Sequence, residues 1–223
     1  MLHFFQHYRS CFKRRGVSRG FTRAPKTGAG FTLIELLVVT VIIMILTGVF
    51  LFQQSRFDSA TILRSLAYST ALSVRQAQVY GTSVLGTGSG DLAFAPAYGV
   101  YFDKSDLTRY ILFADQSPAN GRYDAAEKIK EFRLGTNYKI SKFCARTTGG
   151  YHCSDNDVQS LQVLFKRPNP DAQFLLLNNA GNDFSESYSS AYIQIRSGEG
   201  TYRTVWVSST GQVSVLAPNT DPS

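Results

Sequence analysis

Hydrophobic and polar positions divide the chain into three regions with different patterns. Residues 31–52 are almost uniformly apolar, and Glu35 is the only charged residue among them. As an α-helix that rises about 1.5 Å per residue, this segment would span roughly 33 Å, which is enough to cross a hydrocarbon core of about 30 Å. The pattern therefore predicts a membrane-spanning helix at residues 31–52.

The second region, residues 53–84, has helical periodicity. Its apolar residues recur at steps of three and four, with arginines between them. The apolar set is Ala60, Leu63, Ala67, Ala71 and Val74. This spacing predicts an amphipathic helix with one buried stripe. Because no proline occurs between residues 31 and 81, we expect one continuous helix of about 50 residues, whose second half is a spine against which a sheet folds.

The third region, residues 98–217, consists of short runs rich in β-branched and aromatic residues, separated by turn signals. A glycine-rich segment before it, residues 85–97, is expected to be a flexible linker, and residues 218–223 form a tail. The runs predict strands at 98–102, 110–113, 129–134, 138–143, 161–165, 174–177, 191–195, 202–207 and 212–216. The predicted fold class is α+β, with the long N-terminal helix packed on an antiparallel β-sheet or a two-sheet sandwich.

The excess positive charge lies in the first 30 residues. The formal net charge is +7, and residues 1–30 hold seven basic residues and no acidic ones. Basic residues that precede the first membrane-spanning segment are retained in the cytoplasm, so the β-rich region would lie on the opposite side of the membrane. The neutral remainder gives no sign of a nucleic-acid partner. A secretory signal peptide is the competing interpretation, but no small-residue cleavage site follows the apolar run.

One carboxylate stands at the start of the apolar segment. At a membrane centre it would cost roughly 2.5–3.5 kcal/mol, and less near an interface, so one interpretation is that Glu35 snorkels at the membrane edge. Residues 30–39, GFTLIELLVV, closely resemble the processing site of type IV pilins and type II secretion pseudopilins. The resemblance implies that a prepilin peptidase removes residues 1–30 by cleavage between Gly30 and Phe31, and that Phe31 becomes N-methylated. It also implies that Glu35 meets the N-terminal amine of a neighbouring subunit, which needs an anionic partner among packed helices.

The resemblance also sets expectations for the whole molecule. It implies a non-enzymatic subunit of a type IV pilus or type II secretion pseudopilus, held in the inner membrane with its N-terminus inside and its globular domain periplasmic or extracellular. Its partners would be the prepilin peptidase, other pilin or pseudopilin subunits, an inner-membrane assembly platform and the lipid bilayer.

The order of elements is most similar to that of H-type minor pseudopilins and competence minor pilins. Some competence members carry DNA-binding arginines beside the last glycine. Here Gln212 and Val213 follow Gly211, so DNA binding is not carried over. Two alternatives stay open: a DNA-binding minor pilin of natural transformation, and a membrane-anchored surface β-domain that is never processed.

Two cysteines remain outside the leader, Cys144 and Cys153. On the oxidising side of a membrane a disulfide is favoured over a metal site, because two thiolates and His152 fall short of four zinc ligands. Gly149 and Gly150 suit a hairpin tip between the two cysteines. His152 is interpreted as a loop residue, and no catalytic constellation can be assembled around it.

A segment at residues 115–127 partly matches a calcium-binding loop. The matching positions are Asn120, Gly121, Asp124 and Glu127. The start of the loop does not match, and Asp115 could supply a ligand only with an inserted residue. We therefore favour an ordinary turn between two strands, since Asp, Asn, Gly and Pro are common turn residues. Calcium is the only cofactor that the sequence suggests, with Asp115, Asn120, Asp124 and Glu127 as its ligands.

Overall fold

The computed structural model describes residues 30–83, 96–116 and 119–222, without the side chains of residues 53–58. The chain divides into two compact units, Met1–Thr47 and Gly48–Ser223. Helix α1, Leu33–Thr82, contributes residues to both. Nearly all of the predicted leader and most of the predicted linker lie outside the described residues.

Helix α1 forms without a break, as expected for a segment that contains no proline. Within the second unit its buried apolar residues form one stripe: Leu63, Ala67, Ala71, Val74 and Ala77. The inclusion of Ala60 in this stripe was wrong, because Ala60 is exposed. The neighbouring Ser59 has a polar partner instead, and its hydroxyl lies 3.1 Å from Glu199 Oε1. The apolar contact of the helix therefore begins at Leu63.

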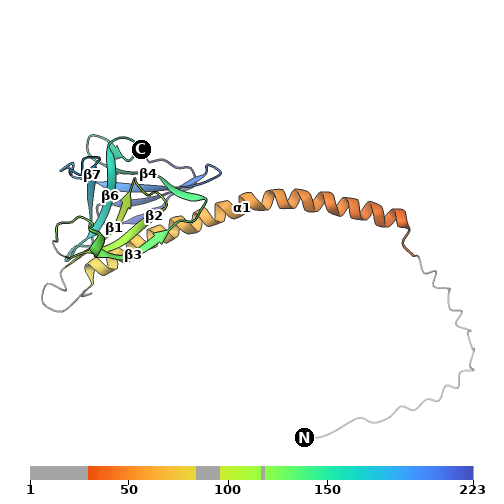
Figure 1. The fold of residues 1–223 in the computed structure, drawn as a ribbon, viewed down its shortest axis with the longest axis horizontal. Helices are drawn as coiled ribbons and strands as arrows, with labels where there is room; N and C mark the ends of the chain where they lie inside the picture. Colours follow the sequence, from red (N-terminus) through yellow and green to blue (C-terminus); the bar gives the residue numbers. More distant parts are fainter. Residues whose placement is uncertain (1–29, 84–95, 117–118, 223) are drawn as a thin grey trace, which may run out of the picture. The chain divides into compact units, whose positions relative to one another are not determined.

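Two five-stranded sheets, both antiparallel, make up the β-rich region (Figure 1). The first has the order β3-β2-β1-β6-β7, with β1 at Ala97–Asp103, β2 at Arg109–Asp115, β3 at Lys128–Arg133, β6 at Val158–Phe165 and β7 at Ala172–Asn178. The second has the order β10-β9-β8-β4-β5, with β4 at Tyr138–Arg146, β5 at Tyr151–Cys153, β8 at Ser190–Ser197, β9 at Tyr202–Ser208 and β10 at Val213–Val215. A short 3-10 helix, η2 at Ala125–Glu127, precedes β3.

The sequence pattern located every strand except β5. This strand follows the predicted hairpin tip, where the Thr147 amide donates a hydrogen bond to the Gly150 carbonyl at 2.8 Å. Its three residues pair with the end of β4. A run this short cannot show alternation, so its pattern does not identify a strand. Because His152 lies in β5, its interpretation as a loop residue was wrong.

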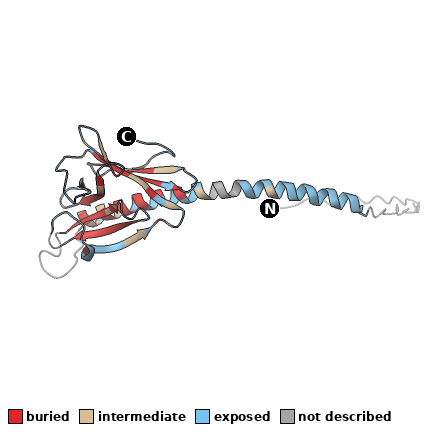
Figure 2. Ribbon diagram, turned by 45° about the horizontal axis from the view of Figure 1, so that its top comes forward, coloured by how far each residue is buried: buried red, intermediate tan, exposed pale blue. Residues whose placement is uncertain are grey.

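One hydrophobic core joins the second half of α1 to both sheets (Figure 2). Alternation along each strand decides which residues enter it. In β8, for example, Ala191, Ile193 and Ile195 belong to this core, whereas Tyr192 belongs to a cluster on the opposite face. The two-sheet form of the predicted α+β fold is therefore the one observed.

Two glycines allow α1 to approach the sheets closely. A Cβ atom at Gly81 would meet the backbone carbonyl of Phe165 in β6. Gly211 has a φ of +80°, and a Cβ there would meet the Pro170 carbonyl and the Gln78 amide. The Gln78 amide donates hydrogen bonds to the carbonyls of both residues, at 2.9 Å to Pro170 and 3.1 Å to Gly211. These contacts tie the end of α1 to the connection between β6 and β7 and to the turn between β9 and β10.

Candidate processing and assembly site

The first turn of α1 contains the predicted assembly residue. The Thr32 hydroxyl accepts a hydrogen bond from the Glu35 amide at 3.3 Å, and the Thr32 carbonyl accepts one from the Leu36 amide at 3.1 Å. Thr32 therefore caps the start of the helix, and its spacing from Glu35 is that of a capping box. The carboxylate of Glu35 lies in the first turn, where the positive end of the helix dipole favours a negative charge.

Thr32 was not singled out from the sequence. The signal was present, because a threonine three residues before a glutamate, at the start of an apolar run, is typical of a helix N-terminus. Next to it, Phe31 is 81% exposed, and a Cβ added at Gly30 would have no described heavy atom within 4 Å. The described residues therefore leave this peptide bond accessible. Cleavage at this bond, methylation of Phe31 and pairing of Glu35 stay predictions.

The apolar part of α1 is exposed along its whole length. The segment Leu33–Phe52 is long and apolar enough to cross a membrane, and none of its most apolar stretch is buried. Its large apolar side chains are each 47% or more exposed. Two threonine hydroxyls donate to carbonyls of the same helix, from Thr40 to Leu37 at 2.8 Å and from Thr47 to Ile43 at 2.7 Å. An apolar surface whose two threonine hydroxyls are hydrogen-bonded within the helix suits contact with lipid or with other apolar helices.

This geometry defines a class: an α+β protein with an exposed apolar N-terminal helix and two antiparallel sheets, consistent with a pilin-like fold. Residues 26–51 match the family model of the prokaryotic N-terminal methylation motif. The match includes Gly30, Phe31 and Glu35, and it supports a type IV pilin-like family. The motif indicates a substrate of prepilin peptidase that becomes a pilin or pseudopilin. Comparisons with curated proteins and with solved structures find no significant match.

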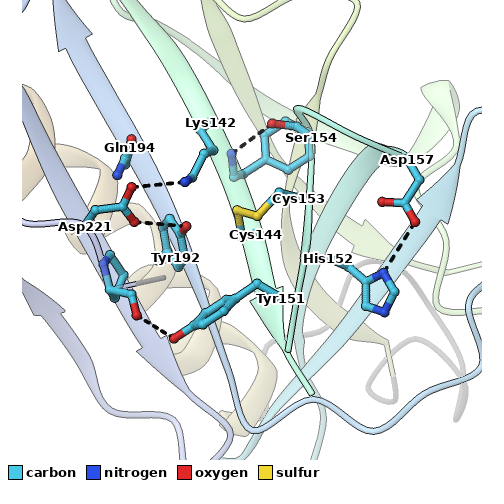
Figure 3. The surroundings of a disulfide bond; sticks show 12 residues. Lys142, Cys144, Tyr151, His152, Cys153, Ser154, Asp157, Tyr192, Gln194 and Asp221 are labelled. Carbon is cyan, nitrogen blue, oxygen red and sulfur yellow. Dashed lines mark hydrogen bonds and ion pairs between the residues drawn. A yellow bond between two sulfur atoms is a disulfide. The ribbon is translucent and has the colours of Figure 1, made fainter. Parts of the chain in front are cut away.

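A disulfide joins Cys144 in β4 to Cys153 in β5 (Figure 3). The two residues stand directly opposite each other in the antiparallel pair, with their Cα atoms 4.1 Å apart. Cys144 is fully buried, and Cys153 is 9% exposed. Both pack with Tyr192, and Tyr151 and Trp206 are partly buried against them. The bond therefore fastens the short edge strand to an aromatic cluster on the second sheet.

His152 lies beside the disulfide and connects two loops. Its Nδ1 atom is 3.4 Å from Asp157 Oδ2, and its Nε2 atom is 3.3 Å from Glu186 Oε2. The ring also packs against Phe184, with 4.7 Å between the ring centres. Because the two carboxylates approach opposite ring nitrogens, both nitrogens are engaged within the protein. This arrangement supports a structural role for His152.

Asp115, buried at the end of β2, organises the segment that was predicted as a turn or a calcium loop. Its two carboxylate oxygens accept hydrogen bonds from the amides of Asn120 at 3.0 Å and Gly121 at 2.9 Å. Burial raises the pKa of Asp115, the two amide bonds oppose this, and the nearby Glu127 charge adds to it. The net direction is upward.

Glu127, which lies in η2, also accepts hydrogen bonds from backbone amides of this segment. Its Oε1 atom accepts a hydrogen bond from the Gln116 amide at 2.8 Å, and its Oε2 atom accepts one from the Asp124 amide at 3.1 Å. Both buried carboxylates thus bind backbone amides, as turn-forming acids do. Among the described residues, no group of three or more His, Cys, Asp or Glu residues could hold a metal ion. The geometry favours the turn, and calcium binding by Asp115, Asn120, Asp124 and Glu127 stays a prediction.

Proposed function

We propose that the chain is a prepilin-like structural subunit, a minor pilin or minor pseudopilin, that is processed and then assembled into a type IV pilus or a type II secretion pseudopilus. The observation that carries this proposal is the exposed apolar helix that begins just after Gly30 and Phe31, with Glu35 in its first turn. Such a surface requires lipid before assembly and partner helices afterwards. The match to the methylation motif supports the same function.

On this proposal each part of the chain has a separate task. Residues 1–30 are a leader that the peptidase removes, residues 31–52 hold the subunit in the inner membrane, and the β-domain lies on the outer side. When an assembly platform brings subunits together, the apolar helices pack against one another, and the Glu35 carboxylate loses its access to the interface. The Phe31 amine of the adjacent subunit then supplies the positive partner that a buried carboxylate requires. The role is structural and needs no catalytic residue.

Co-expression with a prepilin peptidase tests the proposal. We expect the first 30 residues to be removed and Phe31 to become the methylated N-terminus, as read by intact mass and N-terminal sequencing. Gly30→Val should block cleavage because it places a bulky side chain at the cut, whereas Gly20→Val in the same leader is the matched control and should be processed. If the wild-type leader is retained while a known prepilin is cut in the same cells, the chain is a permanently anchored surface domain instead.

A further inference from the structure

A pocket of about 260 Å³ lies where β4 begins and β8 ends. Its lining includes two cations, Lys139 and Arg196, and no acidic residue. The other lining residues are Thr108, Thr136, Asn137, Tyr138, Ser197 and Gly198. The pocket therefore combines positive charge with hydroxyl and amide groups, a composition that suits an anion.

Lys139 and Arg196 stand directly opposite each other in the antiparallel pair of β4 and β8. Side chains in such positions share one face of the sheet, with Cβ atoms about 4.5–5.5 Å apart, and like charges there are unfavourable. Among the residues that the structure describes, neither side chain forms an ion pair, whereas Arg109 and Lys142 each contact a carboxylate. An anion between the two opposed cations would offset their repulsion.

Two acidic residues near the pocket are engaged with other groups. Asp106 accepts a hydrogen bond from the lining residue Thr108 at 2.6 Å, and it pairs with Arg109 at 2.8 Å. Glu199, in the turn after β8, accepts a hydrogen bond from the Ser59 hydroxyl at 3.1 Å. Neither carboxylate lines the pocket, so the anion that the two cations require has to come from a ligand.

The pocket adjoins the part of α1 that follows the apolar segment. The hydroxyl of the lining residue Tyr138 donates a hydrogen bond to the Ser59 carbonyl at 3.4 Å. Phe52, the end of the apolar segment, precedes Ser59 by seven positions in the same helix and the same compact unit, or about 10 Å along the axis. The headgroup layer of a bilayer extends about 5–8 Å beyond the hydrocarbon core. With Leu33–Phe52 in a membrane, the pocket therefore lies close to the lipid phosphates.

We propose that Lys139 and Arg196 bind the phosphate group of an anionic phospholipid at the surface of the membrane that holds the chain. A guanidinium donates two parallel hydrogen bonds to phosphate oxygens, and an ammonium adds a compact positive charge. The Thr136 hydroxyl and the Asn137 amide, which have no hydrogen-bond partner in the described part of the chain, supply further donors. Lipid is favoured over free phosphate because a membrane anchor keeps the pocket at a high local concentration of headgroups.

This contact holds the β-domain at the membrane surface before assembly, and it is lost when the subunit leaves the bilayer. The inference rests on the proposed function only in that Leu33–Phe52 must lie in a membrane. It does not depend on removal of the leader, so a chain that prepilin peptidase leaves uncut would still bind the lipid.

The acetylation rate of the Lys139 amine tests the proposal at the site itself. The full-length chain is held in uncharged detergent micelles that contain phosphatidylglycerol or, as the zwitterionic reference, phosphatidylcholine. Brief treatment with an acetylating ester is then followed by peptide mass spectrometry. We expect phosphatidylglycerol to slow acetylation of Lys139 at least about threefold relative to phosphatidylcholine, the value for a site that is two-thirds occupied. Lys166, an exposed amine outside the pocket, is the internal reference and should react equally in both.

Substitutions then locate the protection. Arg196→Gln should abolish it, whereas Arg122→Gln removes the same charge from an exposed residue outside the pocket and should retain it. Because one amine is read, lipid that the basic residues 1–30 attract does not contribute. The proposal is overturned if Lys139 reacts equally with both lipids, or if Lys166 is protected to the same extent. Equal protection by inorganic phosphate at the same concentration would assign the pocket to a free anion and reject the lipid. These outcomes are read on the wild-type chain and need no variant to fold.

Discussion

At the start of α1 the backbone amide of Glu35 donates a hydrogen bond to the side-chain hydroxyl of Thr32 at 3.3 Å. This bond does not involve the Glu35 carboxylate. The helix cap and the proposed assembly contact therefore use different groups of Glu35, and substitutions can separate them.

Glu35→Ala should retain processing, membrane insertion and the helix cap but lose incorporation into filaments. The reason is that the Phe31 amine of the neighbouring subunit would be buried without its partner, which typically costs about 3–5 kcal/mol for each subunit added. Glu35→Gln should be intermediate, since it keeps a hydrogen-bond acceptor without the charge. The measurement is the fraction of processed protein recovered in sheared or cross-linked filaments.

Thr32→Ala is the matched control for this prediction. It removes the capping hydroxyl, at a typical cost of about 1 kcal/mol to the helix, and leaves the Glu35 carboxylate in place. Its effect on incorporation should therefore be smaller than that of Glu35→Ala. Wild-type incorporation by Glu35→Ala, with processing and folding verified, would show that Glu35 is only an interfacial residue at the membrane edge.

The helix and most strands could be predicted from the sequence because their patterns repeat over many residues. The apolar run and the absence of proline define α1, and the alternation of Ala191, Ile193 and Ile195 with polar or aromatic neighbours defines β8. Strand β5 could not be predicted, since its three residues are too few for a period and the pairing with β4 depends on the turn at Gly150. The pairing of one strand with another depends on the tertiary structure and cannot be predicted from the local sequence pattern.

Residues of the candidate site could be predicted from the sequence only where they belong to a short, specific motif. Gly30 and Glu35 stand in a string that is specific by itself, whereas residues 219–222 are held by isolated bonds to residues elsewhere in the sequence. Asp221 lies 3.0 Å from Lys142, 79 positions earlier. Residues 218–223 therefore look like a plain tail in the sequence, although residues 219–222 are packed on the sheet.

Gly81→Ala should destabilise the β-domain. The added Cβ would collide with the backbone carbonyl of Phe165, which cannot rotate away, and overpacking of this kind typically costs about 1–3 kcal/mol. Gly48→Ala is the control on the same helix, because nothing lies within 4 Å of the added atom. Urea unfolding in detergent, followed by the fluorescence of Trp206, should show a lower midpoint for Gly81→Ala alone. Equal midpoints for both variants would contradict the close approach.

Removal of the disulfide should destabilise the same domain. Cys144 and Cys153 lie nine positions apart, and a cross-link of this length stabilises by roughly 2–3 kcal/mol, chiefly by restricting the unfolded chain. The double variant Cys144→Ala with Cys153→Ala is preferred to serines, because both positions are buried. Its unfolding midpoint should fall and should not respond to reductant, whereas the wild-type midpoint should fall on reduction. A wild-type protein that ignores reductant and yields two free thiols in non-reducing peptide mapping would reject the bond.

The pH dependence of stability should reflect Asp115. This carboxyl is buried near Glu127, and both accept backbone amides, yet burial keeps the pKa of Asp115 above its ordinary value of 3.8. A carboxyl whose pKa is higher in the folded state adds stability that is complete below the ordinary pKa and is lost as the pH rises through the folded-state value. The wild-type protein therefore contains a component of stability that decreases with rising pH, just above that ordinary value.

Asp115→Asn should abolish this component, because its side chain is neutral at every pH. The free energy of unfolding of the variant minus that of the wild type should therefore increase as the pH rises above the ordinary value of 3.8. Replacement of one of the two oxygens that bind Asn120 and Gly121 adds a cost that does not depend on pH. Urea unfolding at a series of pH values, with Trp206 fluorescence as the signal, measures this difference, and the titration of carboxyls that do not interact with Asp115 cancels in it. A difference that stays flat or decreases over this range would show that the pKa of Asp115 is not raised, and that the two amide bonds outweigh its burial.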